Sequence, residues 1–442
     1  MTIKVGLVSL GCPKNLVDSE IMLGLLKESG FLITNHEQEA DAIIINTCSF
    51  INDAKEESIK TILEMAKLKE EGNCRALLVA GCLAQRYHSE LMEEMPEIDG
   101  FIGTGAVHEV PDLVRRTLAG EKASLVGKPG YLHTAAQPKI LATPSYTAYL
   151  KIAEGCDNRC SYCTIPLVRG PFRSREIEDI VIEAAGMLKQ GAKELVLVAQ
   201  DTTRYGLDLY DRPSLDRLLD RLTGLEGLGW IRMLYTYPTL INDQLIQLMA
   251  RKRKICRYLD IPLQHASDSV LQRMKRQGSN AEILQLIEKL RAEIPGIMLR
   301  SSFIVGFPGE TEEDFEELLS FMTRVQFDRV GVFAYSREDG TPAASMSGQV
   351  PEETKLARRD KAMSLQQKIS LENNRRKIGT KLFVLVEKNN TGGTYTGRSE
   401  GDAPDIDGKV HFTSDIQLQP GDFVKVLITA AQPYDLSGEL AP

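Results

Sequence analysis

The sequence predicts an α/β protein with an N-terminal parallel α/β domain, a central partial barrel of six β/α units and a small C-terminal β-barrel. Short apolar runs alternate with helical patterns as far as Arg337, which is typical of parallel sheets covered by helices. Short strand patterns separated by Gly, Asn and Asp follow near the C-terminus and indicate an all-β unit. The chain has 442 residues, which is too long for one ordinary domain.

The composition argues against a membrane protein and against a disulfide-rich secreted protein. Apolar residues make up 43% of the chain and charged residues 26%, as in ordinary globular proteins. The apolar runs are far shorter than the roughly 20 residues of a membrane span, and the start MTIKVGLVSLGC has neither a basic lead nor a small-residue cleavage site. Eight cysteines in such a chain favour metal or redox chemistry. We expect a cytoplasmic protein, and the net charge of −8 argues against one built mainly to bind nucleic-acid phosphates.

Three apolar runs of the N-terminal third each end in a cysteine. The runs and their cysteines are Lys4 to Leu10 with Cys12, Asp41 to Asn46 with Cys48, and Arg75 to Ala80 with Cys82. The cysteines are roughly 35 residues apart, the length of a βαβ repeat. Helical patterns lie between them, at Ser19 to Ser29 and at Asp53 to Glu71.

Because ligands bind outside the carboxyl ends of parallel strands, these three cysteines are expected to meet in one crevice and to hold a cluster. The alternative is that they are buried structural residues, which are common in protein cores. We expect that role for Cys74 and Cys256, since both lie where a strand begins.

A second set of cysteines, Cys156, Cys160 and Cys163, lies in the run EGCDNRCSYC with the spacing CxxxCxxC. It follows the strand-like run TAYLKIA and precedes a loop rich in arginine that includes Arg169. Three thiolates on one tight loop can hold three irons of a cubane cluster and leave the fourth iron open to a small molecule. The alternative is zinc, whose loops usually supply four ligands as two CxxC pairs.

The central region predicts six strands that alternate with helices. The strands are expected at Thr147–Ala153, Glu194–Ala199, Ile231–Tyr235, Arg257–Leu263, Met298–Val305 and Arg329–Ala334. The helices are expected at Glu176–Gln190, Ser214–Leu222, Asn242–Arg251, Asp268–Arg276, Ala281–Glu293 and Thr311–Val325. Six units are fewer than the eight of a closed barrel.

Several ends of these strands carry polar residues or glycine. Gln200 follows the second strand, Ser301 lies in the fifth, and the run that contains Gly306, Phe307 and Gly309 follows it. Glycine lets a ligand approach the backbone closely. The alternative for this run is an ordinary turn before a helix, with Thr311 as its N-cap and Asp314 in its first turn. His265 after the fourth strand is interpreted as a structural residue.

The C-terminal part begins with a charged helical connector over Glu352–Lys377 and continues as a small β-barrel of the oligonucleotide-binding type. From Gly379 onward the chain has five basic and nine acidic residues, which is the wrong balance for binding phosphates. Four of the acids, Glu400, Asp402, Asp405 and Asp407, lie in one loop, and we expect this loop to dock a basic partner such as a ribosomal protein. The alternative is that the charge only keeps the barrel soluble.

These patterns give a provisional division of the chain. It consists of an N-terminal α/β domain at 1–125, a linker at 126–143, the partial barrel at 144–350, the helical connector at 351–378 and the small barrel at 379–442.

The cysteine loop with Tyr162 before its last cysteine resembles the radical S-adenosylmethionine (SAM) superfamily, and the C-terminal barrel resembles a TRAM domain. Together with the first three cysteines, this layout resembles the methylthiotransferases. The segments SLGCPKNLVDSE and EGCDNRCSYCTIPLVRGPFRSR are similar to the branch called RimO, which modifies an aspartate of a small-subunit ribosomal protein, the twelfth.

The resemblance implies two [4Fe-4S] clusters and SAM as cofactors. Cys12, Cys48 and Cys82 would bind the cluster that carries the added sulfur, and Cys156, Cys160 and Cys163 the cluster that reduces SAM to a radical. That radical would remove hydrogen from the β-carbon of the aspartate, which then takes the methylthio group. The pocket for SAM would involve Tyr162, Gln200, Ser301, Gly306, Phe307 and Gly309.

Other functions remain open at this point. The nearest alternative is a methylthiotransferase acting on a transfer-RNA adenosine near the anticodon; the others are an iron–sulfur redox protein and an RNA-binding factor with a zinc site. For partners we expect the basic ribosomal protein, a low-potential electron donor and a sulfur donor, with no membrane association. We expect a monomer.

Overall fold

The computed structural model describes residues 2–441 and confirms the predicted α/β class. At the N-terminal end six parallel strands form one sheet in the order β2-β1-β3-β4-β5-β6. These strands are β1 Lys4–Ser9, β2 Leu32–Thr34, β3 Ala42–Thr47, β4 Ala76–Gly81, β5 Gly100–Ile102 and β6 Ala123–Leu125. The three strands expected before Cys12, Cys48 and Cys82 are therefore β1, β3 and β4, and they lie side by side.

Helices cover both faces of this N-terminal sheet. Apolar residues of α1 (Pro13–Glu28) and α5 (Val110–Leu118) pack on one face. Those of α2 (Asn52–Ala66), α3 (Leu68–Glu71) and α4 (Cys82–Glu94) pack on the other. The short 3-10 turns η1 (Glu37–Glu39) and η2 (Val107–Glu109) complete this part.

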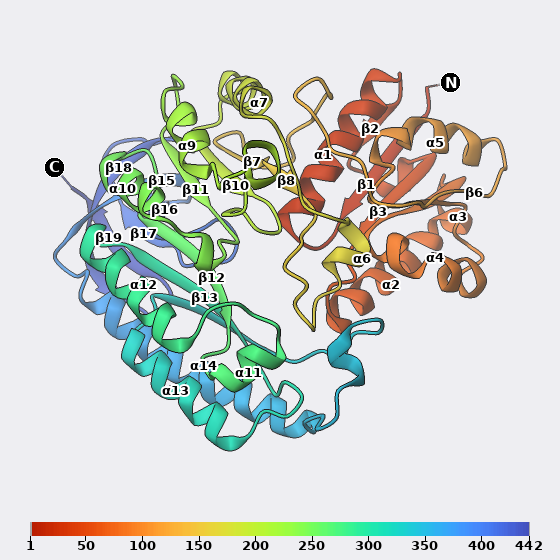
Figure 1. Cartoon of the computed structure of the whole chain (residues 1–442). Helices are drawn as coiled ribbons and strands as arrows, with labels where there is room; N and C mark the ends of the chain where they lie inside the picture. The colour runs from red at the N-terminus through yellow and green to blue at the C-terminus, as the bar shows by residue number, and fades with distance from the viewer. Residues whose placement is uncertain (1, 442) are drawn as a thin grey trace.

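Helix α1 begins six residues earlier than the sequence pattern predicts. Pro13 occupies its first turn, where the fixed φ of proline suits a helix start. Its first turns bury polar residues as well as apolar ones, including Asn15 and Asp18. The usual alternation of apolar and polar residues is therefore missing where α1 faces the rest of the protein (Figure 1).

The central part contains the six predicted strands as two parallel sheets that adjoin in a partial barrel. The first has the order β11-β10-β7 and the second the order β12-β13-β14. The strands are β7 Thr147–Lys151, β10 Glu194–Val198, β11 Trp230–Met233, β12 Tyr258–Gln264, β13 Met298–Val305 and β14 Arg329–Ala334. The two sheets meet where Thr236 N donates to the carbonyl oxygen of Asp260, at 2.9 Å.

The predicted helices lie outside the partial barrel, mostly within one or two residues of their expected limits. They are α7 Ile177–Lys189, α9 Leu215–Thr223, α10 Asp243–Arg251, α11 Asp268–Arg273, α12 Asn280–Glu293 and α13 Glu312–Val325. The sequence analysis missed the shorter elements β8 Ala153–Glu154, β9 Arg173–Ser174, α6 Ile165–Arg169, α8 Leu207–Tyr210, η3 Pro238–Leu240 and η4 Pro342–Ser345. Segments this short have too few residues for a periodic pattern.

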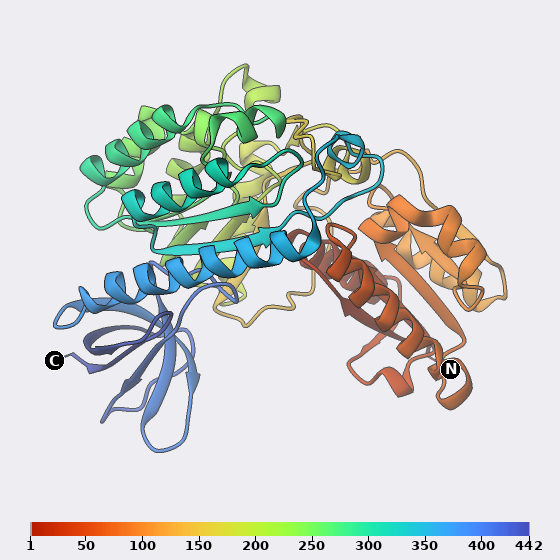
Figure 2. The same ribbon diagram turned by 90° about the horizontal axis from the view of Figure 1, so that it is seen from below.

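A long helix, α14 (Glu352–Arg375), runs beneath the partial barrel and leads to the C-terminal strands (Figure 2). These strands are β15 Lys381–Asn389, β16 Thr394–Ser399, β17 Val410–Thr413, β18 Phe423–Ala431 and β19 Leu436–Leu440. They close into a barrel in the order β15-β16-β17-β19-β18. The small barrel and the N-terminal sheet lie at opposite sides of the partial barrel (Figure 1). Within residues 2–441 no helix combines the length and the apolar character that crossing a membrane requires.

A fully buried carboxylate fastens the small barrel to the partial barrel. Glu194 at the start of β10 accepts hydrogen bonds from Arg232 Nε at 3.0 Å and from Arg398 Nη2 at 2.6 Å. None of the three side chains has any exposed surface. Burial alone would raise the pKa of Glu194, but the two guanidinium groups outweigh it and lower that pKa to about 2.

The expectation that the acidic loop docks an external partner is wrong for two of its four carboxylates. Asp402 is buried and accepts from Arg329 at 2.8 Å, and Asp407 accepts from the hydroxyl group of Tyr258 at 2.7 Å. Both contacts join the small barrel to the partial barrel. Asp405 is exposed. A count of charges cannot distinguish carboxylates that face solvent from those used inside the protein.

Removing the Glu194 carboxylate should weaken the whole fold. We expect Glu194→Ala to lower the free energy of unfolding by about 3–5 kcal/mol, because it leaves two buried guanidinium groups without their shared partner. Urea unfolding followed by circular dichroism measures this. Glu178→Ala is the matched control, since Glu178 pairs with Arg221 on the surface, and it should leave the unfolding midpoint unchanged. Equal midpoints for the two variants would contradict the structural role given to Glu194.

Candidate functional site

The first trio of cysteines, Cys12, Cys48 and Cys82, lies at the carboxyl ends of β1, β3 and β4. Cys12 caps the start of α1, Cys48 lies in the loop after β3, and Cys82 opens α4 directly after β4. The chain passes from β1 outward to β2 and then returns to β3 on the other side, so a topological switch point lies between β1 and β3. Ligands of open α/β sheets bind at such a point. The structure therefore brings together the three cysteines that the sequence pattern grouped.

Gly11, directly before Cys12, allows the ends of β1 and β3 to lie close together. Gly11 has a φ of +87°, and a β-carbon there would lie 3.1 Å from Cys48 Sγ and 2.8 Å from its β-carbon. Any side chain at this position would collide with the neighbouring cysteine. Gly11 thus meets two constraints at once, a left-handed backbone and a close approach of two strand ends.

The three thiols of the first trio influence one another's ionisation. Burial, together with the neighbouring Cys82 and Cys12, raises the pKa of Cys48 to about 12. Burial also raises the pKa of Cys82, against the opposing effect of Arg169. Burial would raise the pKa of Cys12 as well, but Lys14, Arg169 and the backbone amides of α1 lower it below its usual value. The site therefore favours a negative charge at the Cys12 sulfur, as a metal-binding thiolate requires.

The second trio, Cys156, Cys160 and Cys163, lies in the loop between β8 and α6. Antiparallel pairing of β8 with β9 closes this loop, and Cys156 N donates to the carbonyl oxygen of Gly170 at 3.1 Å. Burial and the other two thiols raise the pKa of Cys163 to about 12, and burial raises the pKa of Cys156 to about 11. In both trios, mutual repulsion between thiolates would be relieved by bound cations.

Both trios fit the donor set of a cubane cluster. Within residues 2–441 no three His, Cys, Asp or Glu side chains are grouped as ligands of a single ion. A cubane cluster offers a separate iron to each thiolate, so its three ligands do not have to converge on one point. Cys74 and Cys256 are buried away from both trios, as the sequence analysis predicts.

A buried ion-pair network joins the two trios. It consists of Asp18, Lys151, Glu154 and Arg169, none more than 6% exposed. Lys151 and Arg169 each contact both carboxylates, with Arg169 Nη1 at 2.6 Å from Asp18 Oδ2 and at 3.3 Å from Glu154 Oε2. Asp18 belongs to α1, beside the first trio, whereas Glu154 lies two residues before Cys156. The network therefore links the start of one cysteine loop to the helix that carries the other.

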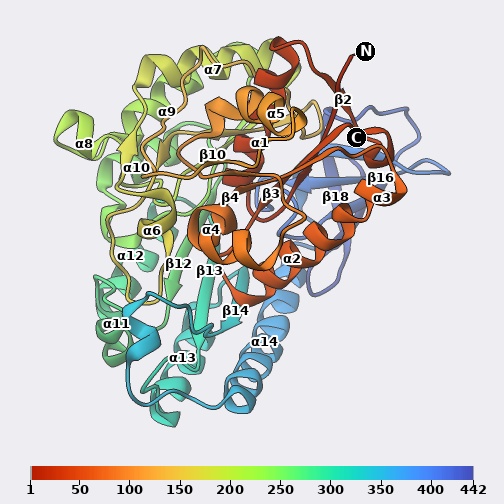
Figure 3. The same ribbon diagram turned by 90° about the vertical axis from the view of Figure 1, so that its right-hand side faces the viewer.

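Arg169 extends this network to a sulfur atom of the first trio. Its Nη2 lies 3.5 Å from Cys82 Sγ and also donates to Asn15 Oδ1. Arg169 ends α6, the helix directly after the second trio, and α6 lies beside α4, which begins with Cys82 (Figure 3). The Arg169 side chain thus contacts a cysteine of the first trio, although it belongs to the helix that directly follows the second trio.

Sequence reasoning missed most of this network. Lys151 and Glu154 interrupt an apolar strand pattern, and a charge inside a buried strand is a signal that such a partner exists. In the sequence Arg169 is distinguished only by its place in an arginine-rich loop. The partners come from segments more than a hundred residues apart, and no local pattern reveals such a pairing.

The side chains predicted to contact SAM lie around the second trio and the strands that follow it. Gln200 Nε2 donates to Glu154 Oε1 at 2.7 Å, and its own carbonyl oxygen is buried with no hydrogen-bond donor among residues 2–441. Ser301 donates to the carbonyl oxygen of Ile261 at 2.9 Å. Tyr162 packs edge-on against Phe307, with ring centres 6.4 Å apart. Gln200 therefore keeps a free acceptor beside Glu154, two residues before Cys156.

The glycine run after β13 is held by packing against other parts of the chain. Gly306 has a φ of +72°, and a β-carbon there would lie 2.3 Å from Lys355 Cγ of α14. Gly309 N donates to the carbonyl oxygen of Gly348 at 2.7 Å. Thr311 caps α13 with Asp314 in a reciprocal capping box, which confirms the turn interpretation. Contact between this run and a ligand stays a prediction.

Two histidines near the site are buried and uncharged. Burial lowers the pKa of His265 to about 3, and its Nδ1 accepts a hydrogen bond from Ser267 N at 3.0 Å. Burial, assisted by Arg175, lowers the pKa of His133 to about 3 against the effect of Glu183. His265 is a structural residue here, as the sequence analysis predicts.

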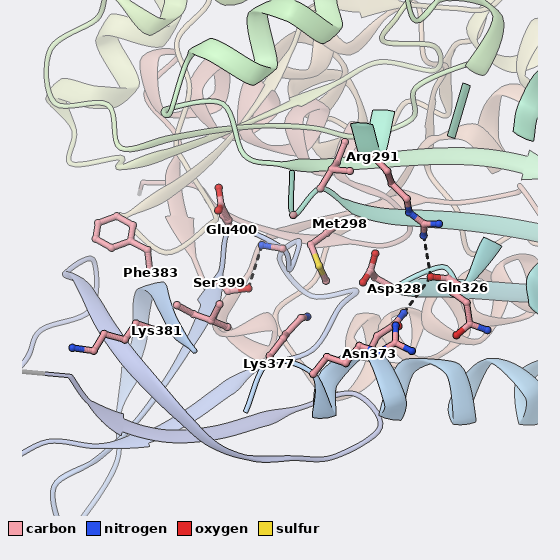
Figure 4. A pocket seen from close by; sticks show the side chains of 15 residues that line it. Arg291, Met298, Gln326, Asp328, Asn373, Lys377, Lys381, Phe383, Ser399 and Glu400 are labelled. Carbon is pink, nitrogen blue, oxygen red and sulfur yellow. Dashed lines mark hydrogen bonds between the residues drawn. The ribbon is translucent and has the colours of Figure 1, made fainter. Parts of the chain in front are cut away.

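A cavity of about 710 Å³ lies far from both trios, between the start of β13, the end of α14 and β15 (Figure 4). Its described lining residues include no cysteine. Arg291 and Asn373 both donate to the carbonyl oxygen of Gln326, at 3.1 and 3.2 Å, where α13 ends. These polar groups complete a helix end, which is their structural use.

Comparisons with known proteins agree with this arrangement. Family models match residues 4–103 (uncharacterized protein family UPF0004), 150–322 (radical SAM superfamily) and 378–441 (TRAM domain). The chain is 67% identical to "Ribosomal protein uS12 methylthiotransferase RimO" of Pelotomaculum thermopropionicum over 99% of both chains. It is 56% identical to the protein of that name from Desulforamulus reducens, again over 99% of both, and 55% identical to that of Desulforudis audaxviator over 98% of this chain and 96% of the relative.

Solved structures share the fold at much lower identity. The radical S-adenosylmethionine methyltransferase TsrM from Kitasatospora setae, solved with cobalamin and a [4Fe-4S] cluster, has a TM-score of 0.57 at 13% identity. That likeness covers 90% of this chain and 77% of TsrM. The cobalamin-dependent radical enzyme OxsB has a TM-score of 0.51 at 13% identity, over 83% of this chain and 56% of OxsB.

The two buried histidines should make the fold sensitive to mild acid. A histidine with a pKa of about 3 in the fold and about 6.5 when unfolded takes up its proton on unfolding at any pH between these values. The free energy of unfolding should therefore fall as the pH falls below 6.5. Urea titrations between pH 6.5 and 5 should show this loss, and the double variant His133→Gln/His265→Gln should reduce its slope by up to about 1.4 kcal/mol per pH unit for each histidine.

The exposed His36 provides the control for this measurement. His36→Gln should leave the slope as it is in the unchanged protein. A double variant with an unaltered slope would show that the buried histidines are not the groups that take up protons.

Proposed function

The chain belongs to the RimO family of radical-SAM methylthiotransferases, and we propose that it adds a methylthio group to the β-carbon of an aspartate in ribosomal protein uS12. The curated relatives carry that name and match the chain over almost its whole length. Enzymes of this kind use SAM with two [4Fe-4S] clusters and need a one-electron donor. The observation that carries the proposal is the buried network that links two cysteine trios across one crevice.

We assign one cluster to each trio. Cys12, Cys48 and Cys82 would hold the cluster that provides the sulfur, and Cys156, Cys160 and Cys163 the one that binds SAM. When bound, these groups supply the radical that removes a hydrogen atom and the methylthio group that replaces it. The protein contributes position, because the two trios must lie on either side of one substrate carbon.

Residues of the chain would orient these groups. Arg169 and the amides at the start of α1 direct positive charge at the first trio. Gln200, fixed through Glu154, offers its free carbonyl oxygen beside the second trio and is well suited to receive a donor group of SAM. For Ser301, Tyr162, Phe307, Gly306 and Gly309 the proposal of SAM contact rests on their position after the strands of the partial barrel.

The same proposal includes the organisation and setting of the protein. The parts are an N-terminal α/β domain at 1–125, a linker at 126–143, the partial barrel at 144–350, a helical connector at 351–378 and the TRAM barrel at 379–442. The enzyme would act as a monomer in the cytoplasm, with uS12 free or in the small subunit as its basic substrate. A low-potential electron donor and a sulfur donor would complete the reaction.

The test is a direct assay of the modification. The protein is reconstituted anaerobically with iron and sulfide and supplied with SAM and a reductant, and separate reactions contain uS12 or unmodified transfer RNA. Mass spectrometry should detect an added methylthio group on the aspartate-bearing peptide of uS12. A methylthio group found on transfer RNA alone would show that uS12 is not the substrate. Absence of both products and of SAM cleavage would favour an iron–sulfur redox protein instead.

The assignment of the first trio predicts a specific loss of metal. Cys48→Ala should remove roughly half of the iron and acid-labile sulfide per chain, because one of two clusters loses a ligand. Methylthiolation should disappear, while SAM cleavage at the second trio should continue. Iron and sulfide analysis and quantification of 5′-deoxyadenosine measure these effects.

Cys74→Ala is the matched control, since Cys74 is also buried in the N-terminal part but donates to the carbonyl oxygen of Ala76 and belongs to neither trio. This variant should keep its full iron content. If Cys48→Ala retained as much iron as Cys74→Ala and turned over normally, the first trio would not be a cluster site.

A further inference from the structure

Lys14 is a buried lysine beside the first trio. It lies in the first turn of α1, two residues after Cys12, and only 8% of its surface is exposed. Its ammonium nitrogen lies 3.3 Å from the centre of the Tyr235 ring. Tyr235 follows β11 of the partial barrel, so the ammonium group lies where the N-terminal sheet and the partial barrel face each other.

This ammonium group has no carboxylate partner among residues 2–441. Two buried acids on the neighbouring segments are already used: Asp18 of α1 pairs with Lys151 and Arg169, and Asp260 pairs with Arg300 at 2.7 Å and accepts from Tyr235 N. Lysine is almost never buried without a partner, because removing its charge from water is unfavourable. An aromatic face compensates this only in part.

The carboxylates around Lys14 are all balanced by other cations. In the buried network two carboxylates, Asp18 and Glu154, balance two cations, Lys151 and Arg169. The amides at the start of α1 are directed at Cys12 and do not neutralise the ammonium group. Lys14 is therefore a positive charge beside the first trio that no carboxylate of the described residues pairs with.

We propose that Lys14 binds the side-chain carboxylate of the substrate aspartate and thereby selects aspartate as the residue to be modified. This inference rests on the proposed function and names the residue that recognises its substrate. The carboxylate carbon of an aspartate is bonded to the β-carbon that is modified. Holding the carboxylate at Lys14, two residues after Cys12, would bring that β-carbon beside the first trio, on the side that faces the partial barrel.

A different role for Lys14 is to compensate the charge of the Cys12 sulfur. That role would affect the cluster of the first trio and would be indifferent to the substrate's side chain. The two roles differ in one measurable respect. Only recognition of the carboxylate distinguishes an aspartate from an asparagine of the same shape.

The experiment compares two peptides of uS12 that differ only in having aspartate or asparagine at the target position. Binding to the anaerobically reconstituted protein, without SAM, is measured by fluorescence anisotropy. The unchanged protein should bind the aspartate peptide about ten- to a hundredfold more tightly, as expected for a charge-assisted hydrogen bond. Equal affinity for both peptides would overturn the proposal without the use of any variant.

Variants of Lys14 then test whether this residue causes the preference for the aspartate peptide. Lys14→Met should lower the affinity for the aspartate peptide to that for the asparagine peptide and leave the latter unchanged, whereas Lys14→Arg should keep most of the preference. Lys60→Met, which removes an exposed lysine of the same part of the chain, is the control and should behave like the unchanged protein. The role of Lys14 would be refuted if Lys14→Met weakened the binding of both peptides equally. It would also be refuted if the preference for the aspartate peptide were unaltered.

Two further readouts separate this inference from the function on which it rests. The iron content of Lys14→Met should equal that of the unchanged protein; a loss of iron would instead assign Lys14 to the cluster. The mass-spectrometric assay with the unchanged protein is independent of Lys14. If it shows no methylthio group on any aspartate, the proposed function fails, whereas modification together with equal binding of both peptides refutes only the inference about Lys14.

Discussion

The ion pairs that Lys151 and Arg169 form with Asp18 and Glu154 decide how the two cysteine trios lie relative to each other. Each cation contacts both carboxylates, and the four groups come from α1, from the adjoining strands β7 and β8, and from α6. A buried network of this kind adds little net stability compared with an apolar interface of the same size. It does disfavour every other position of α1 relative to β7, β8 and α6, because a shift of α1 would leave buried charges unpaired. Its value here is the fixed relation between two sites that, in the proposed function, act on one carbon atom.

The same principle fixes the C-terminal barrel at the other side of the partial barrel. Glu194 with Arg232 and Arg398, and Asp402 with Arg329, are buried at that contact. Part of the acidic excess of the small barrel is therefore used internally, and less of it faces a partner than the composition indicates. Both neighbours of the partial barrel are thus attached through buried charges, and the carboxyl ends of its strands remain directed at the first trio.

Much of this architecture could be predicted from local sequence patterns. The strands that end in Cys12, Cys48 and Cys82 are short apolar runs, and burial on both faces of a parallel sheet produces such runs directly. The capping box of Thr311 and Asp314 is also a local feature. The start of α1 was placed too late because its first turns bury polar residues against another part of the chain. The acidic loop was misjudged for a similar reason, since the partners of Asp402 and Asp407 are distant in sequence.

The sequence by itself determined the parts and the reactive residues: three N-terminal strands that each lead to a cysteine, six strands of a partial barrel, a small barrel, and two sets of three thiols. These follow from periodicity and spacing, which act over a few residues at a time. Only the structure shows that β2, β5 and β6 extend the N-terminal sheet to six strands. Only the tertiary structure decided which charges meet. It brings Arg169 into contact with Cys82 and pairs Asp18 with two cations. It also leaves Lys14 beside Tyr235 without a carboxylate partner among the described residues. Contacts between residues so distant in the sequence depend on how the domains pack, and electrostatic partners at such separations leave no trace in a local pattern.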